Sequence, residues 1–295
     1  MVDVVLAPSR PLESGTDVPG SVRLRQGGSA ATTARWCARL GARTSLVASV
    51  GRDPEGRALV AAVRADGVVA RVARIARAGT GRIGVIVTPD GERSFVADRA
   101  AADLLAPHDL KAAWFAGAHV LHLPAYSLLG EPLGLAGKRA IELARAAGAL
   151  VSLDVASIGP LLARGRRPAQ ALVADAGADL LFATAAEADA LLGRHAVDGL
   201  LEFAPQAVVK RGAKGATVLA REDGERLRFE VATEHLVATD TTGAGDAFDA
   251  GFLVAWLGAR AAGSSQAAAL QRAALAGHRA AGRHLTSPRA ELPLG

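Results

Sequence analysis

The feature that most constrains the fold of this chain is the alternation of short apolar runs with helical segments along its second half. The apolar runs occupy residues 118–123, 149–155, 178–183 and 207–212, and two further strands are expected at 216–220 and 226–231. Helical segments are expected at residues 131–147, 169–176, 185–192, 243–257 and 266–281. Strands that alternate with helices indicate a parallel sheet with helices on both faces. We therefore expect an α/β fold with a central, mostly parallel sheet, built as a single domain over residues 1–295.

The N-terminal third of the chain has a different pattern. Helices expected at 28–40 and 55–65 flank an apolar strand that ends at Gly51. Three β-rich pieces follow at residues 68–75, 82–88 and 92–97. Between the last two, Pro89-Asp90-Gly91 predicts a hairpin turn, because Pro presets φ and Gly permits a positive φ. These pieces predict a small β-rich insertion.

Composition excludes several classes of protein. Half of the residues are hydrophobic and 21% are charged, which is unlike a disordered chain. Cys37 is the single cysteine, so no internal disulfide can form, and a reducing cytoplasm is the expected compartment. The longest uncharged stretch, residues 112–130, contains two histidines and a proline and makes a poor membrane span. No signal peptide is visible, and we expect no membrane association.

The net charge of +5 comes from basic residues that are scattered rather than clustered. No block of like charges occurs, and aromatic residues do not interleave with the basic ones, so we expect no nucleic-acid partner. The charge is compatible with a small polyanionic ligand such as a nucleotide. Asn is absent from the whole chain.

Two motifs in the chain are misleading. Gly79-Thr80-Gly81-Arg82-Ile83-Gly84 has the spacing of a dinucleotide fingerprint, but a strand and a hairpin follow it where that fingerprint requires a helix. No Walker A sequence occurs. His119 and His122 lie three apart on an expected strand, so their side chains point to opposite faces and are unsuited to bind one metal.

Residues 239–256 carry the strongest chemical signal, because a glycine turn runs directly into a helix. Backbone N–H groups converge at such a helix start, and with the helix dipole they form an anion hole. Asp246 in the first turn could take a proton from an attacking hydroxyl while the amides stabilise a transferring phosphoryl group. A capping Asp beside a structural turn is the alternative, and chemistry alone leaves both open.

The segment DTTGAGDAF, residues 240–248, resembles the C-terminal signature of the ribokinase-like carbohydrate and purine kinases. Gly27-Gly28 before a helix and Gly51-x-Asp53-x-x-Gly56 after the next strand resemble the N-terminal signature of that family. The resemblance runs from Asp3 to about Gly282. It implies a ribokinase-like fold with a β-rich lid and ATP-dependent phosphorylation of a hydroxymethyl group on a small sugar or sugar acid.

The resemblance also implies roles for individual residues. Asp246 would be the general base, with the anion hole made by Gly243, Ala244 and Gly245. The acceptor would be bound by Asp3, Gly27, Gly28 and Thr32, although Asp3 could instead be a frayed surface residue. The nucleotide side would comprise Thr184, Lys210, Gly212 and Gly215. Glu187 would organise Mg²⁺ through water, and Asp240 and Thr242 match positions that bind a monovalent cation such as K⁺ in some members.

Several departures from the family pattern bear on activity. Thr32, Thr184, Ala102 and Asp249 stand where the family often carries Asn, which fits the absence of Asn from the whole chain. Pro124 replaces an acidic sugar contact of true ribokinases, which counts against ribose. The chain also begins close to Asp3, where the family has a preceding central strand, so we expect either a start placed too late or a sheet with unpaired edges.

These observations leave three hypotheses. A sugar kinase is the leading one, with ATP and Mg²⁺ as donor. A nucleoside kinase of the same fold is its rival, although no aromatic residue precedes Trp36 to stack on a base. A catalytically weak sugar- or nucleotide-binding protein is the third. We also expect the lid, residues 3–26 and 68–99 approximately, to cover the sugar pocket and to pair with the lid of a second copy.

Overall fold

The computed structural model describes residues 1–90, 92–193, 197–222, 224–234, 236, 238, 240–288 and 291–292. Two compact units make up the chain. The first comprises Met1–Leu105, Val237–Gly243 and Leu285–Gly295, and the second comprises Ala106–Leu236 and Ala244–His284. Among the described residues, no helix combines the length and the apolar character that a membrane crossing requires.

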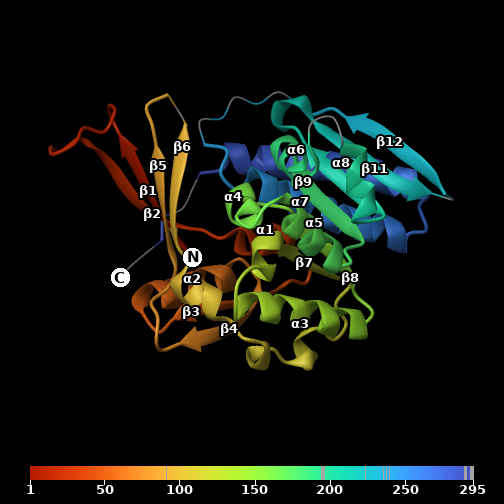
Figure 1. Cartoon of the computed structure of the whole chain (residues 1–295), viewed down its shortest axis with the longest axis horizontal. Coiled ribbons are helices and arrows are strands. Elements are labelled where there is room, and N and C mark those ends of the chain that lie inside the picture. Colours follow the sequence, from red (N-terminus) through yellow and green to blue (C-terminus); the bar gives the residue numbers. More distant parts are fainter. Residues whose placement is uncertain are drawn as a thin grey trace. The chain divides into compact units, whose positions relative to one another are not determined.

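The second unit contains a six-stranded sheet with the order β12-β11-β10-β9-β8-β7 (Figure 1). Its strands are β7 (Val120–Pro124), β8 (Leu150–Asp154), β9 (Leu180–Thr184), β10 (Gln206–Lys210), β11 (Ala216–Glu222) and β12 (Glu225–Val231). The strands β7 to β10 run parallel, and β11 and β12 add an antiparallel edge. The mostly parallel sheet expected from the apolar runs is therefore confirmed.

Helices cover both faces of this sheet. They are α3 (Leu133–Ala146), α4 (Ile158–Leu162), α5 (Arg166–Asp175), α6 (Ala185–Leu192), α7 (Ala244–Ala261) and α8 (Gln266–Thr286). Successive strand residues point to opposite faces, so Leu181 packs in the core beneath α5 and α6, whereas Phe182 packs against α7 and α8. Burying an apolar side chain of this size contributes about 1.5–3 kcal/mol, and two-sided burial explains why these strands are continuous apolar runs.

The first unit contains two smaller sheets. A four-stranded sheet, named here the lid sheet, has the order β2-β1-β5-β6 and consists of β1 (Val2–Pro8), β2 (Gly20–Gln26), β5 (Arg82–Val87) and β6 (Arg93–Asp98). A two-stranded parallel sheet pairs β3 (Ser45–Gly51) with β4 (Val69–Ile75). The helices of this unit are α1 (Ser29–Arg39) and α2 (Pro54–Ala65).

The segment Val69–Ile75 differs from expectation, because it lies outside the lid sheet. It forms β4 and pairs in parallel with β3 from Ser45↔Val69 onward, joined to it through α2. A helical crossover brings the next strand back parallel to the first, and Val63 and Val68 are buried with Leu46 at this junction. The β4 strand is thus the second strand of a β-α-β unit. Its short length and mixed polarity made it look like a lid strand in the sequence.

Two further expectations concern chain segments at strand ends. The turn Pro89-Asp90-Gly91 joins β5 to β6, but Gly91 lies outside the described residues. In the described part of the chain, β7 pairs with β8 alone and β3 pairs with β4 alone. Each of these two strands therefore has an edge without a β-partner among the described residues.

Asp53 fastens three segments of the first unit. Its carboxylate caps α2 by accepting from the Gly56 N–H at 2.8 Å, and it accepts from the N–H and hydroxyl of Thr80 at 2.6 and 2.5 Å. The Thr80 hydroxyl in turn accepts from the Gly51 N–H at 3.0 Å. Burial alone would raise the pKa of Asp53, but these hydrogen bonds outweigh it and hold the pKa below its ordinary value. The motif Gly51-x-Asp53-x-x-Gly56 is thus also a structural clamp.

The clamp generates a stability prediction. Asp53→Ala should lower the free energy of unfolding by about 2–4 kcal/mol, through the lost helix cap and the unsatisfied Thr80 donors. Because the folded-state pKa is depressed, this stabilisation is present above the unfolded pKa and is lost as pH falls through the folded pKa. The melting temperatures of the wild-type chain and of Asp53→Ala should therefore converge as the pH is lowered. Asp17→Ala, in an exposed connection, is the control, and equal melting of all three at neutral pH would contradict the clamp.

Candidate active site

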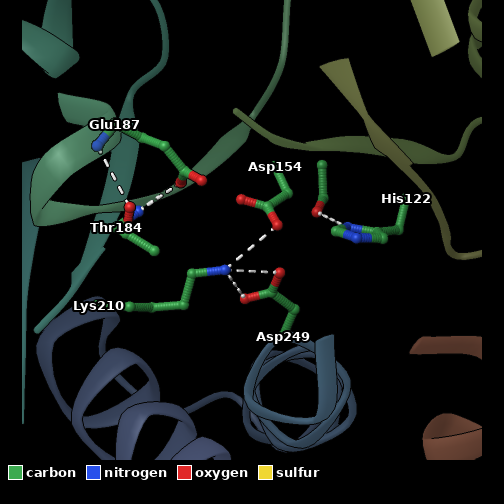
Figure 2. Close-up of polar contacts among 7 residues, drawn as sticks. His122, Asp154, Thr184, Glu187, Lys210 and Asp249 are labelled. Carbon is green, nitrogen blue, oxygen red and sulfur yellow. Dashed lines mark hydrogen bonds and ion pairs between the residues drawn. The ribbon is translucent and has the colours of Figure 1, made fainter. Parts of the chain in front are cut away.

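Polar residues end three neighbouring parallel strands of the second unit. Asp154 ends β8, Thr184 ends β9 and Lys210 ends β10, and Thr184 and Lys210 are register partners. In open α/β sheets, ligands bind outside the carboxyl ends of the strands. Figure 2 shows these side chains converging with Glu187 and Asp249. We call Asp154, Glu187, Lys210 and Asp249 the charged cluster.

Lys210 is the centre of the charged cluster. Its Nζ lies 3.0 Å from both carboxylate oxygens of Asp249 on α7 and 3.3 Å from Oδ2 of Asp154 (Figure 2). The side chains are almost completely buried, with Lys210 10% and Asp249 0% exposed. Burial alone would lower the pKa of Lys210, but the carboxylates of Asp154, Asp249 and Glu187 outweigh it and raise the pKa. Lys210 therefore stays charged.

The three carboxylates exceed the single ammonium in charge. Burial, with the neighbouring Asp154 carboxylate, raises the pKa of Glu187, and burial raises the pKa of Asp249 despite the opposing effect of Lys210. Asp154 Oδ1 is buried and has no hydrogen-bond partner among the described residues. Carboxylate oxygens that lack sufficient positive charge are the donors that Mg²⁺ prefers. The residues present therefore fit Mg²⁺.

No group of three metal-ligating side chains occurs in the part of the chain that the structure describes. A bound Mg²⁺ would accordingly take most of its ligands from water and phosphate oxygens, as this ion commonly does. The charged cluster could then supply one or two carboxylates.

Thr184 and Glu187 form a reciprocal cap on α6. The Thr184 hydroxyl accepts from the Glu187 N–H at 3.2 Å, and Glu187 Oε2 accepts from the Thr184 N–H at 2.7 Å. This geometry accounts for the Thr-Ala-Ala-Glu sequence without any ligand. It favours the view of Thr184 as a capping residue, while Glu187 also faces Asp154 (Figure 2).

The glycine turn adopts the backbone that the sequence indicates. Gly243 has φ +78°, a conformation that disfavours any residue with a Cβ, and α7 begins at Ala244 with Asp246 in its first turn. Gly245 lies in that first turn, on the side of Lys210. Orphan N–H groups at this helix start are suited to an anion.

Two glycines of the expected nucleotide side have structural explanations. Gly212 has φ +57° and Gly215 has φ +84°, within the turn that joins β10 to β11. A Cβ at Gly215 would also overlap the Val231 carbonyl oxygen on β12. The turn therefore requires glycine at this position whatever else it binds.

The expected acceptor-binding residues lie together in the first unit. A Cβ at Gly27 would overlap the carboxylate of Asp3, so this glycine is what allows Asp3 its position beside the N-terminus of α1. Gly28 is the N-cap of α1 with φ +96°, and the Thr32 hydroxyl donates to the Gly28 carbonyl at 3.2 Å. Asp3 belongs to β1 rather than to a frayed end.

The expected cation-binding residues face two arginines within the first unit. Arg25 on β2 donates to Asp240 Oδ2 at 2.8 Å, and Arg93 on β6 donates to the Thr242 hydroxyl at 2.8 Å. The Thr242 N–H donates to Asp240 Oδ1 at 3.0 Å. Positive charge is thus already present at this segment.

His122 is a core residue of the second unit. Its Nδ1 lies 2.8 Å from the Ser152 hydroxyl, and its ring meets Phe182 edge-on at 6.1 Å. Burial, aided by the Lys210 charge, lowers the pKa of His122 to about 4. The imidazole is therefore neutral and structural at ordinary pH.

Sequence reasoning did not single out Asp154, and it treated Asp249 only as a departure from Asn. A usable signal existed for both. Asp154 is the one charged residue closing the apolar run of residues 149–155, and Asp249 follows Asp246 at helical spacing on an otherwise apolar helix. A charge inside a buried element usually requires a partner.

A family model described as "pfkB family carbohydrate kinase" matches residues 1–292. Among curated proteins, fructokinase-1 of Oryza sativa subsp. japonica is 34% identical over 233 residues. These residues cover 75% of this chain and 71% of the rice protein.

Solved structures match over nearly the whole chain. Adenosine kinase from Sinorhizobium meliloti has a TM-score of 0.79 at 25% identity and covers 100% of this chain and 94% of its own. A protein from E. coli assigned as ribokinase II, in complex with ATP and Mg²⁺, has a TM-score of 0.75 at 23% identity and covers 98% of this chain and 91% of its own. The ribokinase-like α/β fold expected from the sequence is confirmed.

The charged cluster generates a second stability prediction. Lys210→Met should lower the free energy of unfolding by about 3–5 kcal/mol, because it leaves Asp249 and Asp154 buried without their partner. The pKa of Asp249, which burial already raises, would then rise further in the folded state, so the stability of the variant should be lost as pH rises from the unfolded pKa through the folded pKa. Denaturant titrations at mildly acidic and alkaline pH measure the free energy of unfolding of the variant and its dependence on pH. Lys214→Met, at an exposed lysine nearby, should change little, and a pH-independent loss would contradict the argument.

Proposed function

From the premise that this chain belongs to the pfkB family of carbohydrate kinases, we propose that its acceptor is fructose or a closely related small sugar. The chain is an ATP-dependent sugar kinase, a phosphotransferase that acts on a sugar hydroxyl. The finer assignment is supported by its similarity to fructokinase-1 of rice. We further propose that the reacting group is a hydroxymethyl group of the sugar.

Asp246 would act as the general base. A carboxylate in the first turn of α7 is held beside the orphan N–H groups that follow Gly243. It would take the proton of the attacking hydroxyl, while the N–H groups of Gly243, Ala244 and Gly245 stabilise charge on the transferring phosphoryl group. The observation that carries the proposal is the position of Asp246 in the first turn of a helix that begins directly after Gly243. A simple binding protein has no need for a base beside an anion hole.

The charged cluster would serve the nucleotide. Glu187 and Asp154 would hold Mg²⁺, directly or through water, and Thr184, Lys210, Gly212 and Gly215 would line the nucleotide side. Mg²⁺ when bound neutralises charge on the phosphate oxygens. Lys210 would fix the positions of the Asp154 and Asp249 carboxylates, since it bonds to both.

The sugar would be bound by residues of the first unit. The Asp3 carboxylate can accept hydrogen bonds from two adjacent hydroxyls, and Gly27 leaves it the room to do so. Gly28 and Thr32 at the start of α1 would complete the acceptor side. Thr32 already donates to its own helix, so it offers the sugar an acceptor oxygen.

The experiment that tests this function is a coupled assay of ADP release with ATP and Mg²⁺ over a panel of sugars and nucleosides. We expect fructose to give the highest kcat/KM. A preference for adenosine would support the nucleoside-kinase alternative, to which the similarity with adenosine kinase also points. Tight binding of sugar or ATP without turnover would instead support a binding protein.

The role of Asp246 has a direct test. Asp246→Asn should lower kcat by roughly 10²–10⁴-fold, the range for losing a positioned proton acceptor, with little change in ATP affinity. Asp189→Asn, at an exposed position on α6, is the matched control. A folded Asp246→Asn protein with wild-type turnover would remove Asp246 from this role.

The metal assignment can be separated from helix capping. Glu187→Gln keeps a side chain able to cap α6 but removes the charge, so it should weaken the response to Mg²⁺ by about 10–100-fold at nearly constant melting temperature. Thr184→Asn should lower the Mg²⁺ concentration for half-maximal activity, because the amide offers the metal's waters a second polar group. Its melting temperature should stay nearly constant, because Asn caps a helix about as well as Thr. Magnesium titrations that leave both curves unchanged would assign the pair to capping alone.

We also propose that the lid sheet forms a homodimer contact. One of its faces carries the apolar residues Leu6, Val22, Ile86, Val4, Leu24 and Val96, beside the polar residues Gln26, Arg82, Ser94 and Asp98. Val22 on β2 and Val96 on β6 lie on the two edge strands of this face, and they are 68% and 67% exposed. Residues 291–292 pair with the outer edge of β2 at Leu24 and Arg25. A second copy could cover the rest of this edge, which has no strand partner among the described residues.

Light scattering at micromolar concentration tests the dimer. We expect a dimer for the wild-type chain and a monomer for the Val22→Asp, Val96→Asp double variant, because a buried unpaired carboxylate is costly at an interface. Leu12→Asp, at an exposed apolar residue outside the strands, should remain dimeric. A wild-type monomer, with and without ligand, would contradict the proposal.

A further inference from the structure

Two arginines of the lid sheet engage the segment Asp240–Thr242. Arg93 donates to the hydroxyls of Thr241 and Thr242 at 2.6 and 2.8 Å, and its guanidinium lies 3.6 Å from Asp240 Oδ1. Arg25 donates to the other oxygen of the Asp240 carboxylate at 2.8 Å. Both arginine side chains are only 21% exposed, so these are not loose surface ion pairs.

These contacts use the side-chain oxygens that a monovalent cation would bind in this segment. The two carboxylate oxygens and the two threonine hydroxyls are the side-chain oxygens of this segment, and each already accepts from an N–H donor or lies beside a guanidinium. A guanidinium offers no lone pair and keeps its charge at any ordinary pH. A cation placed here would meet two like charges. The residues as placed therefore do not fit K⁺, in contrast to the sequence-based expectation.

The charge balance leads to the same conclusion. Asp240 contributes one negative charge, against two positive charges from Arg25 and Arg93. Asp3, the register partner of Arg25 on β1, adds a second carboxylate to this face of the lid sheet. Among these four described side chains, two guanidiniums thus offset two carboxylates, which does not favour a further cation.

We propose that the guanidiniums of Arg25 and Arg93 take the place of a bound monovalent cation. They hold the segment Asp240–Thr242 in position and make phosphoryl transfer by this chain independent of monovalent cations. The segment leads directly into Gly243 and α7, the elements assigned above to the anion hole. Arg25 and Arg93 act through this segment, so they are positioning residues rather than catalytic ones. The proposal rests on the kinase activity but not on the identity of the sugar.

The first test measures melting temperature and needs no substrate. The wild-type chain should melt at the same temperature in potassium chloride and in tetramethylammonium chloride at equal ionic strength, because tetramethylammonium is too large to replace K⁺. Removing both guanidiniums with Arg25→Met and Arg93→Met should leave Asp240 without its counter-charge. The double variant should then melt at a higher temperature in K⁺ than in tetramethylammonium.

The second test measures turnover with ATP, Mg²⁺ and fructose in the same two salts. Wild-type kcat should not depend on the salt, whereas the double variant should be activated by K⁺ by about fivefold or more, a typical size for coupling between two sites. Arg23→Met is the matched control. Arg23 lies on the same strand and face as Arg25 but pairs with Glu291, so its variant should show no response to K⁺.

Two outcomes would overturn the proposal. One is a wild-type chain that is activated or stabilised specifically by K⁺, since the two guanidiniums should already occupy the place of a bound cation. The other is a folded double variant whose melting temperature is the same in both salts, which would show that the arginines have only a structural role. If fructose is not the acceptor, turnover is absent in every salt while the melting comparison still decides, so the two failures are distinguishable.

Discussion

The buried ammonium of Lys210 is the interaction on which the second unit depends. It joins the end of β10 to the end of β8 through Asp154 and to α7 through Asp249, so one charge links the sheet to the helix that carries Asp246. Burial of three carboxylates would be prohibitive without it. Because the desolvation cost is met by charge pairing, the same arrangement brings uncompensated carboxylate oxygens to the edge of the sheet where a metal and phosphates can use them.

Much of this architecture could be predicted from the sequence, because the information was local. Continuous apolar runs such as residues 178–183 identified strands buried on both faces, and the glycine before α7 identified a helix start suited to an anion. The family resemblance supplied roles for residues, which pattern alone could not. Asp154 and Asp249 were harder, because their importance comes from a lysine distant in sequence, and only the fold brings the three side chains together.

Tertiary context decided where the local sequence left alternatives open, and for one segment the sequence-based expectation was wrong. Val69–Ile75 has the composition of a lid strand, but the α2 crossover pairs it with β3. Asp240 has the residue type of a cation ligand, yet its neighbours are arginines from β2 and β6, more than a hundred residues earlier in the chain. In each case the sequence specified what a residue can do, and long-range pairing selected which of those possibilities the fold uses.

The reciprocal cap of Thr184 and Glu187 has a consequence for how this protein can change. One carboxylate closes the first turn of α6 and also contributes charge beside Asp154. A mutation that removes the side-chain oxygen together with the charge, such as Glu187→Ala, therefore also frays the helix, at a cost of about 1 kcal/mol for a lost cap. Residues with one role can be substituted freely, whereas a substitution at Glu187 must keep the capping oxygen whatever it does to the charge. We expect laboratory evolution to retain Glu187 and to accumulate substitutions in the lid sheet instead.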